Sequence, residues 1–178
     1  MTEQIRALAL EATFTRAEYV EIDSVVFRPE VRDMCAVNTC RRYGTTWACP
    51  PGVGTLEECR DRLRSFSHLL LFSKKYDLED SFDFEGMVEG QKDFKVTVDR
   101  FAQLLGDSLS SYLLYSNEGC DRCATCTYPD APCRFPHMLR PSLEASGLVV
   151  GDLANAAGIP YNNGPATVTY FGAIAFTI

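Results

Sequence analysis

Four cysteines near residue 120 have the spacing of ligands to a metal centre. Cys120, Cys123, Cys126 and Cys133 form the pattern C-x2-C-x2-C-x6-C. On an iron–sulfur cube the ligand sulfurs lie on the order of 6 Å apart, and cysteines three residues apart on one short loop can reach separate corners. A tetrahedral zinc ion would draw the sulfurs to about 3.8 Å of one another, because Zn–S bonds are about 2.3 Å long. The spacing therefore favours a [4Fe-4S] cluster, with zinc as the alternative.

The fourth cysteine of this run leaves two questions open. The first three are spaced as in bacterial ferredoxins, but Cys133 follows after six residues and precedes Arg134 instead of proline. In two-cluster ferredoxins the fourth cysteine of the run binds the other cluster. Whether Cys133 closes the same cube is therefore open. His137 has a zinc-like spacing from Cys133 and is an alternative ligand.

A second group of cysteines lies nearer the N-terminus. Its members are Cys35, Cys40, Cys49 and Cys59, with the weakly specific spacing C-x4-C-x8-C-x9-C. Thr55 and Glu58 form a capping box, so Cys59 falls in the first turns of a helix, where amide dipoles favour a thiolate or an anionic cluster. The alternative is that Cys59 packs in the core with Leu56 and Leu63. Two groups of four match the ligand count of two cubes, so we expect one or two [4Fe-4S] clusters.

Composition limits the class of protein. The 178 residues fit a single domain, residues 1–178, and eight cysteines without a secretory signal indicate ligands in a reducing, cytoplasmic setting. No apolar run approaches the length of a membrane span. The net charge of −7 disfavours nucleic acids and anionic membranes as partners. A redox partner protein is the partner that we expect, and the sequence does not indicate an oligomeric state.

Charged and aromatic residues near the cysteines fit an anionic cofactor. Each cube held by four thiolates adds roughly two negative charges, which nearby cations would offset. Six arginines flank the two groups: Arg32, Arg41, Arg42, Arg122, Arg134 and Arg140. Tyr43 and Trp47 lie between cysteines and are candidates to shield a cluster from water. The acidic stretch 77–85 reads as a solvated loop, or alternatively as a docking surface for a basic redox partner.

Hydrophobic patterning predicts an α/β or α+β fold. We expect a single-domain sandwich of a small mixed sheet and helices, with the two cysteine-rich loops at one end of the sheet. The expected strands are residues 19–26, 68–76, 111–116 and 166–178. The expected helices are residues 3–12, 55–66 and 85–105, with a further helix within 135–146.

Two long motifs carry a family resemblance. VRDMC followed by YGTTWACPPGVGTLEEC, together with CDRCATCTYPDAPCRFPHMLRPSLEASG, resembles an uncharacterised family of bacterial and archaeal predicted metal-binding proteins over residues 28–160. The resemblance implies metal binding by Cys35, Cys40, Cys49, Cys120, Cys123, Cys126 and Cys133, with Cys59 as an eighth candidate. It implies no reaction.

Three functions remain open at the level of sequence. The first is an electron-transfer or redox-accessory protein with one or two clusters. The second is an enzyme in which one cluster keeps an open iron for substrate or sulfur chemistry, which the irregular first group suggests. The third is a zinc-stabilised binding module. The sequence does not decide whether the protein is an enzyme, and it indicates no catalytic residue.

Overall fold

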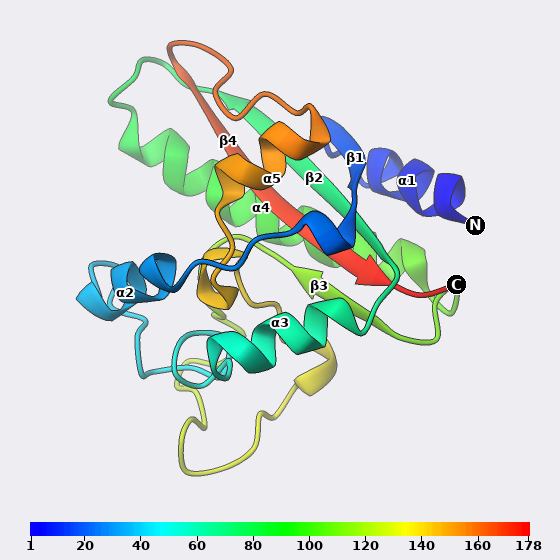
Figure 1. Ribbon diagram of the computed structural model, residues 1–178. Helices are drawn as coiled ribbons and strands as arrows, with labels where there is room; N and C mark the ends of the chain where they lie inside the picture. Colours follow the sequence, from blue (N-terminus) through cyan, green and yellow to red (C-terminus); the bar gives the residue numbers. More distant parts are fainter.

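The sheet that organises the molecule has four antiparallel strands in the order β1-β2-β4-β3. The computed structural model describes residues 1–178. The strands are β1 (Arg16–Val20), β2 (His68–Asp77), β3 (Tyr112–Tyr115) and β4 (Thr167–Phe176). The central strands β2 and β4 are paired over their full length, and β1 and β3 form the edges (Figure 1).

Five helices accompany the sheet. They are α1 (Thr2–Glu11), α2 (Pro29–Val37), α3 (Leu56–Arg64), α4 (Phe84–Leu105) and α5 (Val150–Ala157). Short 3-10 turns occupy Ile22–Ser24, Pro136–Met138 and Glu144–Ser146. None of the helices combines the length and the apolar character that crossing a membrane requires.

Each face of the sheet packs into its own hydrophobic core, because successive residues of a strand point to opposite faces. Leu70 and Phe72 of β2 join the core that includes α1 and α4. Leu69 and Leu71 join the other core, to which α3 contributes Leu63 and to which α5 also belongs. The covering of both faces explains why β2 and β4 read as continuous apolar runs instead of alternating ones.

The structure confirms an α+β fold and most of the expected elements. The sheet is antiparallel throughout, where a mixed sheet was expected. The first strand is Arg16–Val20 and not residues 19–26, since its pairing with β2 ends at Val20 and a 3-10 turn follows. The expected helix within 135–146 is wrong, because Pro136 and Pro141 interrupt the chain and only two 3-10 turns form there.

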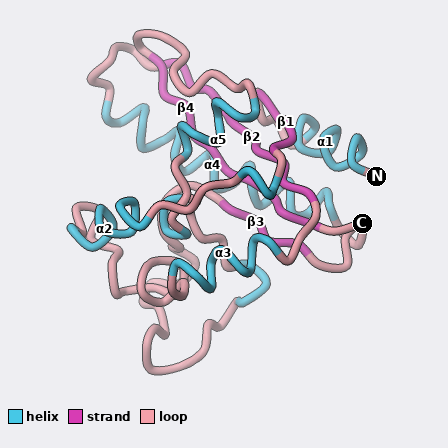
Figure 2. Tube along the Cα trace, in the orientation of Figure 1, coloured by secondary structure: helices cyan, strands magenta, loops and turns pink.

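Both cysteine-bearing segments are largely irregular backbone (Figure 2). They lie side by side beyond the C-terminal end of β3, near α2 and α3 (Figure 1). This gathering at one end of the sheet is the arrangement that the sequence predicts. Segments that lack regular backbone pairing need side-chain contacts to fix them, and these contacts build the site.

Candidate metal centre

Helix α4 holds the start of the second cysteine segment. Lys95 and Asp99 are four residues apart and share one face of the helix. Lys95 Nζ donates to the backbone oxygen of Gly119 (3.1 Å) and to the Asp121 carboxylate (2.7 Å), and Asp99 forms an ion pair with Arg122. The backbone on both sides of Cys120 is therefore tied to a long helix whose other face is buried in the core.

Hydrogen bonds within the segment fold it back on itself. The Thr127 hydroxyl donates to the backbone oxygen of Pro132 (2.9 Å), and the Ala131 N–H donates to the backbone oxygen of Thr127 (3.0 Å). The Arg134 guanidinium donates to the backbone oxygen of Thr125 (2.9 Å). These bonds close the loop between the third and fourth cysteines, so that both face the same interior.

All four cysteines of this segment line one small cavity of about 20 Å³, which we call the four-cysteine site. The remaining lining residues are Trp47, Arg122, Thr127, Arg134, Phe135 and Leu139. Cys133 thus shares its site with the other three. His137 is not among the lining residues, so the structure gives no support to His137 as a replacement ligand.

The thiol of Cys126 lies in surroundings that favour its ionised form. Burial opposes ionisation, but the backbone N–H groups of Tyr128, Trp47 and Thr127 are directed at the sulfur and outweigh it, with a further contribution from Arg134. The pKa of Cys126 is lowered as a result. Backbone N–H groups directed at a ligand sulfur are one of the means by which proteins adjust an iron–sulfur centre.

The first three cysteines of the other group line a second cavity, of about 190 Å³, which we call the three-cysteine site. Cys35 lies in α2, and the chain reverses at Asn38 in the left-handed conformation (φ 61°) before it reaches Cys40. Burial raises the pKa of the Cys35 thiol, as do Cys40 and Cys49. That Cys40 and Cys49 act on Cys35 agrees with the three thiols sharing one cavity.

A buried hydroxyl accompanies the third of these thiols. Thr46 Oγ1 is buried, has no hydrogen-bond partner of its own and lies beside Cys49. Burial raises the pKa of Cys49, and the Thr46 hydroxyl acts in the opposite direction. The hydroxyl lies where it could donate to a negatively charged sulfur, which accepts a hydrogen bond more strongly than a neutral thiol does. The local chemistry therefore fits a metal-bound thiolate.

Two carboxylates also line the three-cysteine site. The Glu144 side chain is accessible from the cavity. Many protein atoms nevertheless lie around its carboxyl group, and this burial raises its pKa. Glu118 has a left-handed backbone (φ 50°), which costs free energy for a residue with a side chain. The cavity thus combines three sulfur donors with two potential oxygen donors.

Cys59 lies apart from the other cysteines. It is 1% exposed in α3, its thiol donates to the backbone oxygen of Val53 (3.7 Å), and Arg32 donates to its sulfur (3.8 Å). The capping box of Thr55 and Glu58 that begins this helix is present as expected. Cys59 does not line the three-cysteine site, so the expected group of four is observed as a group of three.

The two sites share a wall at Gly119. A Cβ atom at this position would lie 2.9 Å from Cys49 Sγ, and Gly119 directly precedes Cys120. Arg42 lines the three-cysteine site and donates to the backbone oxygen of Cys120 (3.5 Å). Glycine is needed here because its missing side chain lets the second segment approach the sulfur of the first. The two groups of thiols are direct neighbours.

Aromatic contacts also join the two segments. The rings of Trp47 and Tyr128 meet edge to face with centroids 4.9 Å apart, and Trp47 Nε1 donates to the backbone oxygen of Ala131 (3.1 Å). A Cβ atom at Gly52 would lie 2.9 Å from the Tyr128 ring, so this glycine makes room for the ring. Trp47 comes from the first segment but covers the four-cysteine site of the second.

The other residues singled out in the sequence are distributed unevenly. Tyr43 lines the three-cysteine site. Arg41 lines neither site, and Arg140 lies beside the four-cysteine site without lining it. The acidic stretch 77–85 contributes to a separate cavity at the far end of β2, with no residue in common with the cysteine sites. Sequence reasoning did not identify Gly119, Glu118 or Glu144.

Fold and site together define a cysteine-rich α+β protein with two adjoining cavities lined by thiols. A family model described as "Predicted metal-binding protein (DUF2284)" matches residues 18–176, and the chain belongs to this family. The resemblance inferred from the motifs is thereby confirmed. No similar curated protein and no similar solved structure was found.

Proposed function

We propose that this metal-binding protein is an iron–sulfur protein that serves in electron transfer or as a redox accessory. The observation that carries the proposal is the convergence of Cys120, Cys123, Cys126 and Cys133 on one cavity. Three thiols six residues or fewer apart, with a fourth from the same loop, suit the corners of a [4Fe-4S] cube.

The surrounding residues fit such a cofactor. A bound cluster would supply reversible one-electron transfer. The backbone N–H groups directed at Cys126 would stabilise negative charge on its sulfur. Arg122 and Arg134 line the site and offset charge that four thiolates would bring into a protein of net charge −7. Trp47 and Phe135 exclude water from part of the cavity wall.

The three-cysteine site supports a second cluster beside the first. Its cavity is larger than the four-cysteine site and measures about 190 Å³. Gly119 lies against the Cys49 sulfur and directly precedes Cys120, so one residue separates the two sites. A cube held there by Cys35, Cys40 and Cys49 would lack a fourth thiolate, since Cys59 lies elsewhere. Glu118 and Glu144 are the protein groups available to the remaining corner.

Metal analysis tests the proposal. Protein purified without oxygen is assayed for iron, acid-labile sulfide and zinc per chain, with visible absorption and EPR before and after dithionite. About eight irons and eight sulfides indicate two cubes, and about four of each indicate one. Zinc without sulfide would overturn the proposal and make the protein a zinc-stabilised module. So would clusters that cannot be reversibly reduced.

Matched cysteine variants assign the cofactor to its site. Cys123→Ser is expected to remove about four irons and four sulfides per chain, because it deletes one of four converging ligands. Cys59→Ser is the control, since this residue lines neither cavity. Equal metal content in the Cys123 variant and the wild type would contradict the assignment of the four-cysteine site.

A second candidate function is an enzyme in which one cluster keeps an open iron. It is favoured by one observation, the presence of three thiols and two carboxylates in the three-cysteine site. Cyanide, a small ligand for an open iron, is expected to change the EPR spectrum of the reduced protein. Cys40→Ala is expected to abolish this response and Cys59→Ala to leave it intact. An EPR spectrum that cyanide does not alter would exclude this candidate.

A further inference from the structure

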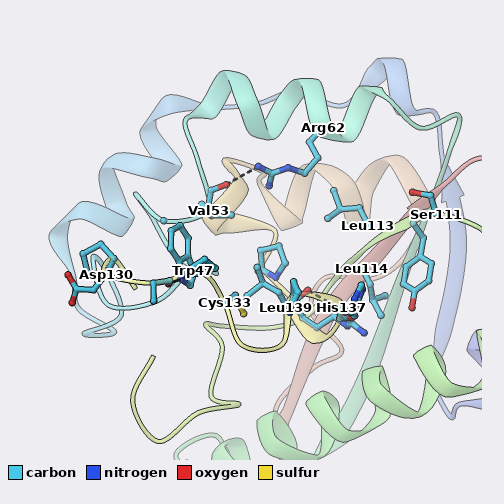
Figure 3. A pocket seen from close by; sticks show the side chains of 18 of the residues that line it. Trp47, Val53, Arg62, Ser111, Leu113, Leu114, Asp130, Cys133, His137 and Leu139 are labelled. Carbon is cyan, nitrogen blue, oxygen red and sulfur yellow. Dashed lines mark hydrogen bonds between the residues drawn. The ribbon is translucent and has the colours of Figure 1, made fainter. Parts of the chain in front are cut away.

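A cavity of about 830 Å³, which we call the large cavity, lies outside both cysteine sites. It is bounded by α3, by the exposed edge of β3 and by residues 129–141 (Figure 3). Trp47, Cys133 and Leu139 line both this large cavity and the four-cysteine site, so the two are neighbours. None of the functions considered so far uses it.

The size and walls of the large cavity are those of a small-molecule site. Typical ligand pockets measure about 300–1,000 Å³ and combine apolar walls with a few polar groups. Here the apolar surface comes mainly from Trp47, Leu113 and Leu139, supplemented by four prolines. Figure 3 shows Trp47 at one end of the cavity and Leu113 and Leu114 towards the other. An apolar body of several carbon atoms fits between them.

The charge of the lining is opposite to that of the protein. The chain has 24 acidic and 17 basic residues, yet the cavity is lined by Arg62, His137 and Arg140 against one acid, Asp130. Figure 3 shows Arg62 reaching from α3 on one side and His137 on the opposite side. A concave surface with excess positive charge attracts anions more strongly than a flat one does.

Neither arginine of the cavity forms a salt bridge, although the Glu58 carboxylate, one turn before Arg62 in α3, acts on Arg62 from a greater distance. Arg62 donates to the backbone oxygen of Val53 (3.2 Å) and forms no salt bridge. Arg140 is half-buried, and its Nη1 donates to the backbone oxygens of His137 (2.7 Å) and Leu139 (3.3 Å). Both guanidinium groups keep N–H donors that no carboxylate satisfies.

Arg140 carries the stronger evidence because its charge is half-buried and it forms no salt bridge. Asp99, the acid that acts on it, is already paired with Arg122. A half-buried charge without a counter-ion costs free energy. An anion bound in the cavity beside Arg140 would supply that counter-ion.

We propose that the large cavity binds a small organic anion. Its carboxylate or phosphate group accepts hydrogen bonds from Arg140 and Arg62, with His137 as a third donor. Its apolar body packs against Trp47 and Leu113. Binding at this site depends on the chain alone, so it stands whichever metal the cysteines hold. Because Cys133 lines both cavities, the ligand lies next to the four-cysteine site.

Calorimetric titration of the full-length, anaerobically purified protein tests the proposal. The probes are benzoate and phenyl phosphate, with benzamide as the neutral analogue of benzoate. At least one of the two anions is expected to bind about tenfold or more tightly than benzamide, because hydrogen bonds to charged groups are the stronger ones. Trp47 is the single tryptophan of the chain, so a change in its fluorescence on binding locates the probe in the cavity.

Arginine variants on one helix provide a matched comparison. Arg62→Gln is expected to weaken anion binding several-fold and to leave benzamide unaffected, and His137→Gln to act in the same direction. Arg64→Gln is the control, because Arg64 is an exposed residue of the same helix and does not line the cavity. Arg140→Met is expected to weaken anion binding about tenfold or more.

The binding results of the variants distinguish whether the large cavity binds anions. Anion binding that falls in the Arg62 variant and persists in the Arg64 variant supports the proposal. Benzamide binding as tightly as both anions, or equal anion affinities in the Arg62 and Arg64 variants, overturns it. The two exposed positions, Arg62 and His137, keep the test valid if Arg140→Met does not fold. Metal content measured on the same samples shows separately whether the iron–sulfur proposal holds.

Discussion

The wall between the two cysteine sites can be tested with one added methyl group. Gly119→Ala places a Cβ atom 2.9 Å from Cys49 Sγ, 3.4 Å from Cγ of Arg42 and 3.6 Å from its Cβ. Non-bonded carbon atoms are most stable at about 3.5–4.0 Å, so Cys49 and the new methyl group must separate by roughly 0.6–1.1 Å. The Cys49 side chain is 7% exposed and has little room in which to move.

The expected consequence is a loss of both stability and metal. Forcing an extra methyl group into a closely packed position costs about 1–3 kcal/mol in the free energy of unfolding. The displaced sulfur belongs to the three-cysteine site, so metal should be lost there before it is lost from the four-cysteine site. Denaturant unfolding gives the first quantity, and iron and sulfide per chain give the second.

Gly151→Ala is the matched control for this experiment. Gly151 lies in α5, and no atom would lie within 4 Å of its added Cβ. Alanine is favoured over glycine in a helix by up to about 1 kcal/mol, so this variant should be as stable as the wild type or more so. If Gly119→Ala keeps wild-type stability and metal content, the two sites do not share the close wall described here.

Three further predictions concern single side chains. Cys59→Ala should lower the free energy of unfolding by about 1–2 kcal/mol, since a buried sulfur is removed, while metal per chain stays at the wild-type value. Thr55→Ala should cost about 0.5–2 kcal/mol by removing the N-cap of α3, and Thr55→Ser should restore most of it, as thermal melts would show. Burial raises the pKa of Asp93, but hydrogen bonds from Lys74 and Tyr76 outweigh it, and the pKa is lowered. The Asp93 carboxylate therefore stabilises the fold above about pH 4, and this contribution is lost as the pH falls through the lowered pKa. The stability deficit of Asp93→Asn should therefore shrink between about pH 6 and pH 3 in denaturant titrations, and a constant deficit would contradict the assignment.

The elements that the sequence predicted are those whose residues face a core. Helix α4 has a strong apolar stripe, and the central strands have long apolar runs, so pattern and packing agree. Helix α2 was not predicted, because none of its residues is buried and Met34 and Val37 are 73% and 75% exposed. Helix α5 was not predicted because it is short and contains Gly151 and Asn155, which are weak helix formers.

The sequence grouped the candidate ligands of the second segment correctly, but it did not group those of the first segment correctly. Spacing is a local property, and it identified the cysteines of the second segment because all four lie on one loop. The first group is spread over two helices and a loop, so its membership depends on tertiary packing. Cys59 is drawn into the core with Leu63 by the burial of one face of α3, and the carboxylate of Glu144 enters the site from far along the chain. Spacing along the sequence could not predict that Glu144 lines the three-cysteine site and that Cys59 does not.

The cationic groups around the sites hold the backbone and also offset charge. Lys95 and Arg42 donate to the backbone oxygens of Gly119 and Cys120, and Arg134 donates to a backbone oxygen within the second segment. Irregular backbone has few partners of its own, so these donors replace the hydrogen bonds that a helix or strand would supply. The same positive charges lie where ionised thiols would accumulate negative charge. One set of side chains therefore serves both purposes, so replacing one of these cations removes a backbone donor and a positive charge together.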